Sequence, residues 1–251
     1  MNSELKYKVI QSEKSFSDFV ESFWMLQNQS ENDKDVIVLP DGRIDLIFSS
    51  SATEPIQVVL LGLETKSDVA TIPANTLMFS VSFKLLATEY IFHASLSHLL
   101  NKASYLSPGF WNVDKEHMND FDSFCKKIAE KLRELLPKQV DTRKQELFNL
   151  IYSSKGALTV KELSEKVFWS SRQINRYFNQ QYGISLKTYC SILRFRASLD
   201  HIAEGKLFPE QNFTDQAHFI KEVKKFSGVI PKELSKNKND RFILLSALQK
   251  K

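Results

Sequence analysis

Two glycines 45 residues apart, Gly183 and Gly228, end segments that match each other position by position. The offset pairs helix caps, inward apolar positions, cations and the residues after each glycine: Ser170 with Asp215, Ile174 with Phe219, Phe178 with Val223, Arg176 with Lys221, Ile184 with Val229, and Lys187 with Lys232. Two unrelated amphipathic helices would match at two or three of these positions by chance. A glycine just past a helix supplies the left-handed residue that ends it. The pattern therefore predicts a structural duplication of two units.

The first unit, "LTVKELSEKVFWSSRQINRYFNQQYG", has the shape of a helix-turn-helix. Thr159 is a candidate cap for the first helix, whose apolar face holds Val160, Leu163 and Val167. Ser170 is a candidate cap for the second helix. The turn between them is short, as two steeply crossing helices require.

A long helix is predicted between the two units, over "SLKTYCSILRFRASLDHIAEG", with Ser185 as its cap. It has two apolar faces, one with Leu186, Tyr189, Cys190, Leu193 and Ala197 and the other with Ile192, Phe195, Leu199 and Ile202. Two apolar faces suit a helix that is wedged between two small units and sets their separation.

The second unit, "LFPEQNFTDQAHFIKEVKKFSG", lacks the first helix of the pair. The offset maps residues 159–166 onto 204–211, and this segment contains Gly205 and Pro209, both unfavourable inside a helix. We therefore predict a truncated unit in which Pro209 starts a single turn. Phe208 and Phe213 are expected to fill the volume of the lost helix.

Charge is divided unevenly along the chain. Residues 155–251 carry 18 Lys and Arg against 9 Asp and Glu, a net +9, whereas residues 1–154 carry 16 against 21, a net −5. A basic C-terminal third on an acidic remainder indicates a polyanionic partner, although a solvated basic surface would give the same count.

Residues 145–235 resemble the DNA-binding domain of the AraC/XylS family in the segments "SSRQINRYFNQQYGISLKTY", "RFRASLDHI" and "DQAHFIKEVKKFSGVIPKEL". The resemblance implies two helix-turn-helix units joined by one long helix, and a bacterial transcription regulator that binds double-stranded DNA. "PDGRIDLIF" resembles part of the small-barrel sensor domain of some members. The sequence departs from the family at Ser164, at the bulky pair Phe168-Trp169, at Leu186, and in the missing helix before Asp215.

A helical wheel over residues 171–182 puts Ile174 and Phe178 inward. Arginine can bond guanine bidentately and Asn or Gln can do the same for adenine, and the first turn of a recognition helix enters the major groove most deeply. Arg172, Asn175 and Arg176 are therefore our candidates for base edges, and Gln173, Asn179 and Gln180 for the groove walls. A solvated polar face is the alternative.

The second unit offers Gln216, Ala217, His218, Lys221 and Lys225 at the equivalent positions. Lone histidines more often cap or lie on the surface. Lys187 and Lys232 follow the two glycines and are candidates for phosphate contacts, which set register rather than sequence choice.

The remaining sequence predicts an α+β protein of more than one domain. We expect a β-rich, small-barrel-like sensor or dimerisation domain over 1–115, a helical linker region over 116–154, an all-α DNA-binding domain over 155–236, and a tail over 237–251 that forms a short docking helix. "DVIVLPDGRIDLIFSS" predicts two strands around a turn at Pro40-Asp41-Gly42, and "IQVVLLGLET" and "TLMFSVSF" predict two more. Residues 142–151 predict a helix capped by Thr142.

The task of the N-terminal domain stays open between ligand sensing and a protein-interaction or homodimer module without ligand. Phe23, Trp24, Phe48, Phe79 and Phe83 either line a pocket or form plain core. Pro40, Asp41, Gly42, Arg43 and Asp45 either put an arginine and acids at a pocket mouth or form only a hairpin turn. The apolar stripe Phe121, Phe124, Cys125, Ile128, Leu132 and Leu135 predicts a helix that packs on its own domain or on a second copy.

Other function classes have little support. The five histidines lack metal-ligand spacing, and no phosphate loop or nucleophile elbow is present, so we expect no metal, no cofactor and no catalytic residue. No apolar run is long enough for a bilayer and "MNSELKYKVI" has no signal core, which favours the cytoplasm. RNA polymerase is a further candidate partner of a regulator, and a nonspecific architectural DNA-binding protein is the rival interpretation.

Overall fold

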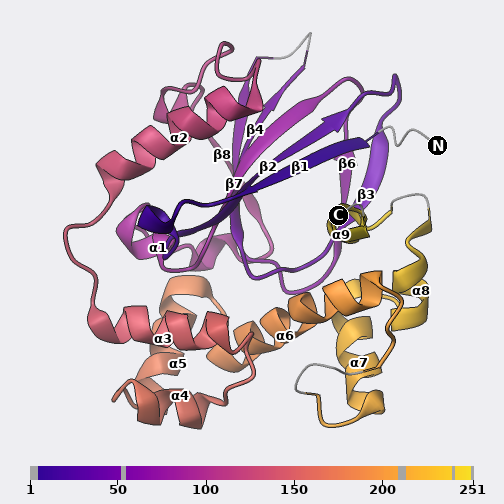
Figure 1. The fold of residues 1–251 in the computed structure, drawn as a ribbon. Coiled ribbons are helices and arrows are strands. Elements are labelled where there is room, and N and C mark those ends of the chain that lie inside the picture. Colours follow the sequence, from indigo (N-terminus) through magenta and orange to yellow (C-terminus); the bar gives the residue numbers. More distant parts are fainter. Residues whose placement is uncertain (1–4, 52–54, 209–212, 239–240, 250–251) are drawn as a thin grey trace.

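Strands occupy the N-terminal half and helices the C-terminal half of the computed structural model, which describes residues 5–51, 55–208, 213–238 and 241–249. Figure 1 shows the strands on one side of the long helix α6 (Leu186–Ala203) and the shorter C-terminal helices grouped around it. The predicted fold class, α+β with a β-rich N-terminal part and an all-α C-terminal part, is confirmed.

The main sheet is antiparallel, with the order β1-β2-β7-β4-β5-β8. Its strands are β1 (Leu5–Gln11), β2 (Val20–Asn28), β7 (Leu77–Phe83), β4 (Ile44–Ser50), β5 (Gln57–Leu61) and β8 (Ala103–Leu106). A second sheet pairs β3 (Lys34–Val38) with β6 (Asp68–Ile72). The two strands around Pro40-Asp41-Gly42 therefore lie in different sheets, and the hairpin interpretation of this turn was wrong. The turn carries the chain from one sheet to the other.

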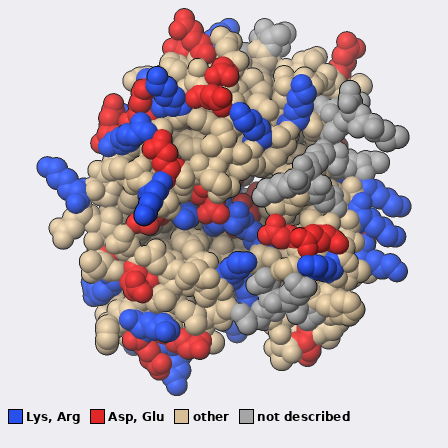
Figure 2. All heavy atoms as spheres, viewed as in Figure 1, with Lys and Arg blue, Asp and Glu red and all other residues tan. Residues whose placement is uncertain are grey.

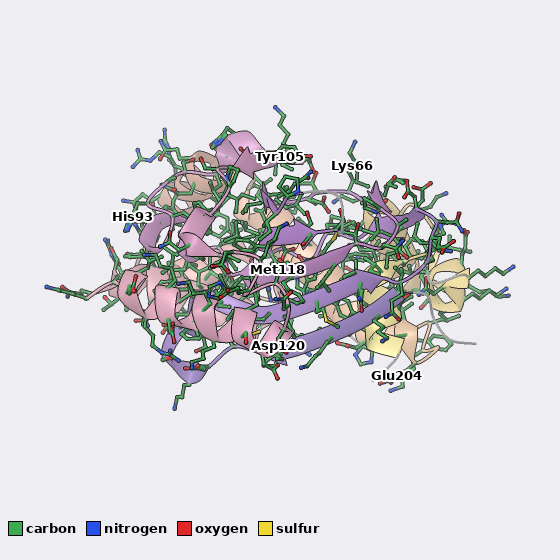
Figure 3. The ribbon with its side chains drawn as sticks, turned by 90° about the horizontal axis from the view of Figure 1, so that it is seen from above. Lys66, His93, Tyr105, Met118, Asp120 and Glu204 are labelled. Carbon is green, nitrogen blue, oxygen red and sulfur yellow. The ribbon has the colours of Figure 1, made fainter. Side chains whose placement is uncertain are left out.

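Helix α2 (Phe121–Leu135) covers one face of the main sheet. The Phe124 ring lies 5.2 Å from that of Phe79 on β7 and 5.4 Å from that of Phe48 on β4, between ring centroids. Asp120 caps the helix by accepting from the Ser123 amide at 2.8 Å. In Figure 3, which views the molecule from above, Asp120 lies at the start of this helix beside the strands. The apolar stripe of α2 thus packs on its own domain and is not free to pair with a second copy.

The remaining helices are short except for α6. They are α1 (Ala87–Tyr90), α3 (Thr142–Ser153), α4 (Val160–Lys166), α5 (Ser171–Tyr182), α7 (Gln216–Ser227), α8 (Pro231–Lys236) and α9 (Ile243–Gln249), with 3-10 turns η1 (Lys14–Phe16), η2 (Ser97–Leu99) and η3 (Phe110–Asn112). Asp141, not Thr142, caps α3, because its carboxylate accepts from the Arg143 amide at 2.9 Å while Thr142 is already helical.

Helix α6 packs on both neighbouring helical groups. Its Tyr189 ring lies 5.8 Å from the Phe178 ring of α5, and its Phe195 ring lies 5.3 Å from the Phe226 ring of α7. The two apolar faces expected for this helix are therefore both buried. α9, from the C-terminal tail, packs on α6 and on β3 with Leu245 fully buried. The prediction of a short docking helix in the tail is confirmed.

We predict that Phe124→Ala lowers the free energy of unfolding by about 3–5 kcal/mol, because it leaves a cavity between α2 and the sheet. Urea unfolding followed by circular dichroism measures the change. Lys126→Ala, an exposed neighbour on the same helix, is the control. A Phe124→Ala loss no larger than that of the control would contradict the packing described here.

Candidate functional site

Polar caps begin both helices of the α4–α5 pair, as predicted. The Thr159 hydroxyl accepts from the Glu162 amide at 3.2 Å, and the Ser170 hydroxyl accepts from the Gln173 amide at 3.3 Å. In return, Gln173 Oε1 accepts from the Ser170 amide at 3.1 Å. Gln173 was predicted at the groove wall, but its side chain is committed to this capping box.

The outward face of α5 carries the predicted polar side chains. Ile174 and Phe178 are fully buried, and the exposed residues are Arg172, Gln173, Arg176, Asn179 and Gln180. Asn175 differs from the prediction, because it is half-buried and its amide donates to the Ser171 carbonyl at 3.0 Å. Within the described residues, Arg172 and Arg176 have no hydrogen bond or ion pair, so both guanidinium groups are available to a ligand.

The turn between α4 and α5 holds the unusual Phe168-Trp169 pair. The Phe168 ring does not fill the turn, because 92% of the residue is exposed and its φ of +53° lies in the left-handed region. Trp169 instead packs inward, with its ring 5.3 Å from that of Tyr177. Phe168 therefore holds a left-handed conformation at the cost of backbone strain.

Helix α7 has the same construction as α5. Asp215 caps it by accepting from the His218 amide at 2.8 Å, and Gly228 ends it with a φ of +79°. The exposed residues on its outward side are Gln216, Ala217, Lys221 and Lys225. Lys187 and Lys232, which follow the two glycines, are also exposed.

His218 has a structural role in this arrangement. Its Nδ1 accepts from the Thr214 amide at 3.2 Å, and its ring lies 5.7 Å from that of Phe213. The histidine is half-buried and fixes the turn before the helix, which makes it a weaker candidate for base contact than its neighbour Ala217. The Gln216 side chain likewise donates to the Leu207 carbonyl at 2.9 Å.

The segment before α7 matches the predicted packing only in part. Phe213 is half-buried, and its ring lies 5.1 Å from that of Phe219, as expected for a residue that replaces the lost helix. Phe208 was expected to do the same, but it is 74% exposed and fills no such volume. Pro209 lies outside the described residues.

Both α5 and α7 point their N-termini away from the sheets. At the C-terminal end of α5, the Leu96 amide donates to the Gln181 carbonyl at 3.0 Å. A Cβ on Gly183 would lie 3.0 Å from the Ser97 carbonyl oxygen, and one on Gly228 would lie 3.6 Å from the Ser67 hydroxyl. Because the C-terminal ends lie against the N-terminal domain, the first turns of both helices face outward (Figure 1).

The two helices lie toward opposite ends of the molecule. Figure 1 shows α5 and α7 beside opposite ends of α6. Figure 2 shows Lys and Arg side chains gathered at the edge formed by α8, where Lys232 and Lys236 are exposed.

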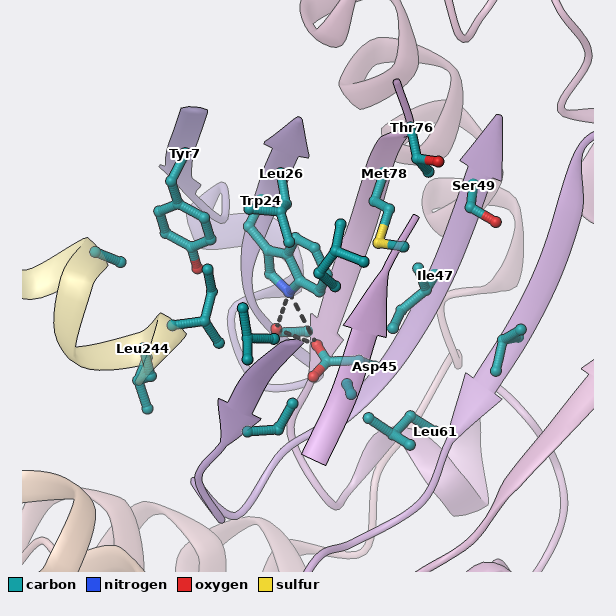
Figure 4. A pocket seen from close by; sticks show the side chains of 18 of the residues that line it. Tyr7, Trp24, Leu26, Asp45, Ile47, Ser49, Leu61, Thr76, Met78 and Leu244 are labelled. Carbon is teal, nitrogen blue, oxygen red and sulfur yellow. Dashed lines mark hydrogen bonds between the residues drawn. The ribbon is translucent and has the colours of Figure 1, made fainter. Parts of the chain in front are cut away.

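A second feature is a cavity of about 1020 Å³ between the main sheet and the β3–β6 sheet. It is the size of a pocket for a small organic ligand. Figure 4 shows Tyr7, Trp24 and Asp45 converging inside it, with Leu244 of α9 along one side. Arg196 of α6 also lines it. The cavity is thus built from both sheets, from α6 and from the C-terminal helix.

Of the five aromatic residues proposed for a pocket, only Trp24 lines this cavity. The other four, Phe23, Phe48, Phe79 and Phe83, are buried core. Successive strand residues point to opposite faces, so Phe23 and Trp24 on β2 separate between the α2 side and the cavity side. Tyr7 and Glu64 were missed, because their place in the cavity depends on strand pairing that no local pattern shows.

Two carboxyl groups of the cavity resist ionisation. Burial, reinforced by the charge of Asp41, raises the pKa of Asp45 to about 7. Asp45 accepts from Trp24 Nε1 at 3.2 Å and from the Ser82 hydroxyl, and these bonds lower its pKa only in part. Burial, with the charges of Asp41 and Asp45, raises the pKa of Glu64 to about 7 as well.

A buried ion cluster joins the cavity to α6. Arg43, 5% exposed, places Nη2 2.9 Å from Glu21 Oε1, and Arg196 Nη1 lies 3.3 Å from the same oxygen. Burial alone would raise the pKa of Glu21, but Arg43 and Arg196 outweigh it and lower that pKa to about 2. Arg43 and Asp41 of the predicted pocket mouth do therefore lie at the cavity, where Arg43 pairs with an acid that the sequence did not reveal.

The turn at Gly42 lies directly against α6. The Tyr189 hydroxyl donates to the Gly42 carbonyl at 3.0 Å. Gly42 has a φ of +78°, and a Cβ there would lie 2.9 Å from the Leu193 side chain. The backbone conformation therefore favours a glycine here, and a larger residue would also crowd the α6 side chains.

Comparison with known proteins gives limited matches. Residues 8–104 match a family model described as a domain of unknown function (DUF6597). No curated protein matches the chain. Similar solved structures include ToxT from Vibrio cholerae, at 11% identity and a TM-score of 0.42 over 92% of this chain and 97% of that chain. ToxT bound to (E)-4-(8-methylnaphthalen-1-yl)but-3-enoic acid has 14% identity and a TM-score of 0.41 over 98% of this chain and 99% of that one.

Within the described residues, no helix is long and apolar enough to cross a bilayer, and no group of three or more His, Cys, Asp or Glu side chains is arranged to hold a metal ion.

We predict that Glu21→Gln removes a pH-dependent part of the stability. The pKa of Glu21 is lowered in the fold from 4.5 to about 2, so its contribution is present above pH 4.5 and is lost as the pH falls toward 2. The shift corresponds to about 3 kcal/mol. Urea unfolding at pH 7, 5 and 3 should show a smaller decline for the variant than for the wild type. Parallel declines in the two proteins would contradict the ion cluster.

Proposed function

We propose that the protein is a bacterial, cytoplasmic transcription regulator of the AraC type that binds specific DNA sequences through two helix-turn-helix units. The observation that carries the proposal is the equivalence of α5 and α7. Each has a polar cap, an αL glycine, a buried contact with α6 and a first turn that faces away from the N-terminal domain. An N-terminal helix end on a basic domain suits a DNA groove.

In the first unit, Arg172 and Arg176 read base edges in a major groove. Both are exposed, and neither has a hydrogen bond or ion pair among the described residues. Asn179 and Gln180 contact the groove walls. Asn175 and Gln173 position the helix through their hydrogen bonds to Ser171 and Ser170. Their side chains contact DNA only if these hydrogen bonds break.

In the second unit, α7 enters the next major groove on the same face of the DNA, about 34 Å away. Gln216, Ala217 and Lys221 are its candidates for bases. Lys187 and Lys232, which follow the glycines that end α5 and α7, contact DNA phosphates. Lys225 does the same, because its ion pair with Glu222 is long at 3.6 Å. The unit is truncated, with Phe213 packed on Phe219 in place of a first helix.

The N-terminal domain acts as a sensor in this proposal. A cavity of about 1020 Å³ favours a small-molecule effector over a protein-interaction module without ligand. Arg196 lines the cavity and belongs to α6, which holds both DNA-binding helices. Effector binding would shift α6 and thereby the spacing of α5 and α7. A second copy of the protein and RNA polymerase are the partners through which occupancy of the cavity by the effector would alter transcription.

Selection of DNA from a random pool tests the function. We expect enrichment of two half-sites about one helical turn apart, because α5 and α7 lie at opposite ends of α6. No enrichment and no binding at low salt would refute the regulator. Enrichment of one short motif would refute base reading by the second unit.

We predict that the double variant Arg172→Ala, Arg176→Ala loses sequence preference. Each lost guanine contact costs about 1–3 kcal/mol of discrimination, so the selected site and a scrambled site should bind alike. Gel shifts on both DNAs measure this. Lys102→Ala, Lys126→Ala removes the same charge from exposed lysines elsewhere and should keep the preference. If both double variants weaken binding to the two DNAs equally, the protein is a nonspecific architectural binder.

We also predict that Lys187→Ala, Lys232→Ala weakens binding to all sequences by a similar factor. Two lost phosphate contacts should reduce the slope of log K against log salt concentration by about 2. Fluorescence anisotropy over a salt series gives the slope. An unchanged slope would show that these lysines do not contact the backbone.

A further inference from the structure

Asp45 and Glu64 line the cavity and form no ion pair with any residue that the structure describes. Among the described residues, the carboxylate of Asp45, on β4, accepts hydrogen bonds from two neutral groups, the Trp24 indole at 3.2 Å and the Ser82 hydroxyl. Glu64, just after β5, has no hydrogen bond or ion pair with any residue that the structure describes. A half-buried carboxylate without a cationic partner is costly, so a ligand that supplies positive charge would be stabilised here.

The cations that line the cavity are already committed elsewhere. Arg43 and Arg196 are its lining guanidinium groups within the described residues, and both pair with Glu21 at 2.9 and 3.3 Å. Neither forms an ion pair with Asp45 or Glu64. Asp33 and Asp68 add further negative charge at the exposed rim. The field at the centre of the cavity is therefore negative, which disfavours an anionic ligand.

The walls around Asp45 are aromatic and aliphatic. Figure 4 shows Tyr7 and Trp24 on one side of the carboxylate, and Ile47, Leu61 and Met78 on the other. Aromatic rings attract organic cations, and aliphatic walls favour an apolar body. An inorganic ion would leave nearly all of the volume of about 1020 Å³ unfilled.

We propose that this cavity binds a small organic cation with an apolar body, such as a primary amine, with its charged group at Asp45 and Glu64 beside Trp24 and its body extending toward Leu244 of α9. The role of this cation as an effector rests on the proposed function, whereas its binding does not. α9 is the wall supplied by the C-terminal tail, so the bound molecule would contact both ends of the chain.

Three probes with one apolar body and different head groups test the proposal: 4-phenylbutylamine, 4-phenylbutanol and 4-phenylbutyrate. Isothermal titration calorimetry on the full chain at pH 8 measures each affinity. We expect the amine to bind about tenfold more tightly than the alcohol, since a charge-assisted contact is worth about one decade. The carboxylate should bind more weakly than the alcohol. Equal affinities, tighter binding of the carboxylate, or no binding of the amine would overturn the proposal.

Variants locate the charge. Asp45→Asn and Glu64→Gln should each reduce the amine's advantage severalfold while leaving the affinity for the alcohol within about twofold, which also shows that the cavity is intact. Asp200→Asn removes the same charge from an exposed site on α6 and should change nothing. Retention of the full amine preference in both cavity variants would overturn the assignment.

The proposed function and the proposed ligand site can be refuted independently of each other. Gel shifts on the selected DNA, with and without 4-phenylbutylamine, are run on the same protein. DNA binding without amine binding overturns this inference and leaves the proposed function standing. Amine binding without DNA binding overturns the proposed function and leaves the ligand site. A changed DNA affinity on adding the amine supports both.

Discussion

The buried guanidinium of Arg43 determines how the two halves of the molecule meet. A charge in this position is tolerated only with a partner at hydrogen-bond distance, and Glu21 supplies it at 2.9 Å. Arg196 of α6 shares the same carboxylate at 3.3 Å. Moving α6 away from the sheet would remove Arg196 from the partly buried carboxylate of Glu21. The ion cluster therefore favours one position of α6 against the turn at Gly42.

Helix α6 connects this ion cluster to the other helices of the protein. Its first half packs on α5 through Tyr189 and its second half on α7 through Phe195. Arg196, next to Phe195 in the sequence, reaches the cavity. A single rigid element thus touches the candidate ligand site and both candidate DNA-binding helices, which is the physical basis for the regulation that we propose. Coupling would need two stable positions of α6, and the shared carboxylate of Glu21 is where a ligand's charge would alter their balance.

The period-two geometry of the strands separates structural from functional residues in the N-terminal half. Phe79 on β7 faces α2, whereas its neighbour Met78 faces the cavity. The sheet is therefore apolar on one face and carries isolated polar groups on the other. The same separation explains why aromatic residues on the strands did not identify the lining of the cavity. Most phenylalanines of these strands face α2.

The sequence by itself determined the features that depend on a few consecutive residues. The caps at Thr159, Ser170 and Asp215, the αL glycines, the extent of α2 and the duplication of α5 and α7 were all predicted, because a cap or a stop is a bond within one helical turn.

Only the tertiary structure decided which distant groups meet. β3 pairs with β6 rather than with β4. Glu21, on β2, is the ion-pair partner of Arg43. Leu244 of α9 lines the same cavity as Tyr7, although the two residues are 237 positions apart in the sequence. Such contacts depend on the closure of long loops and on the burial of charge, and neither leaves a periodic signal in the chain.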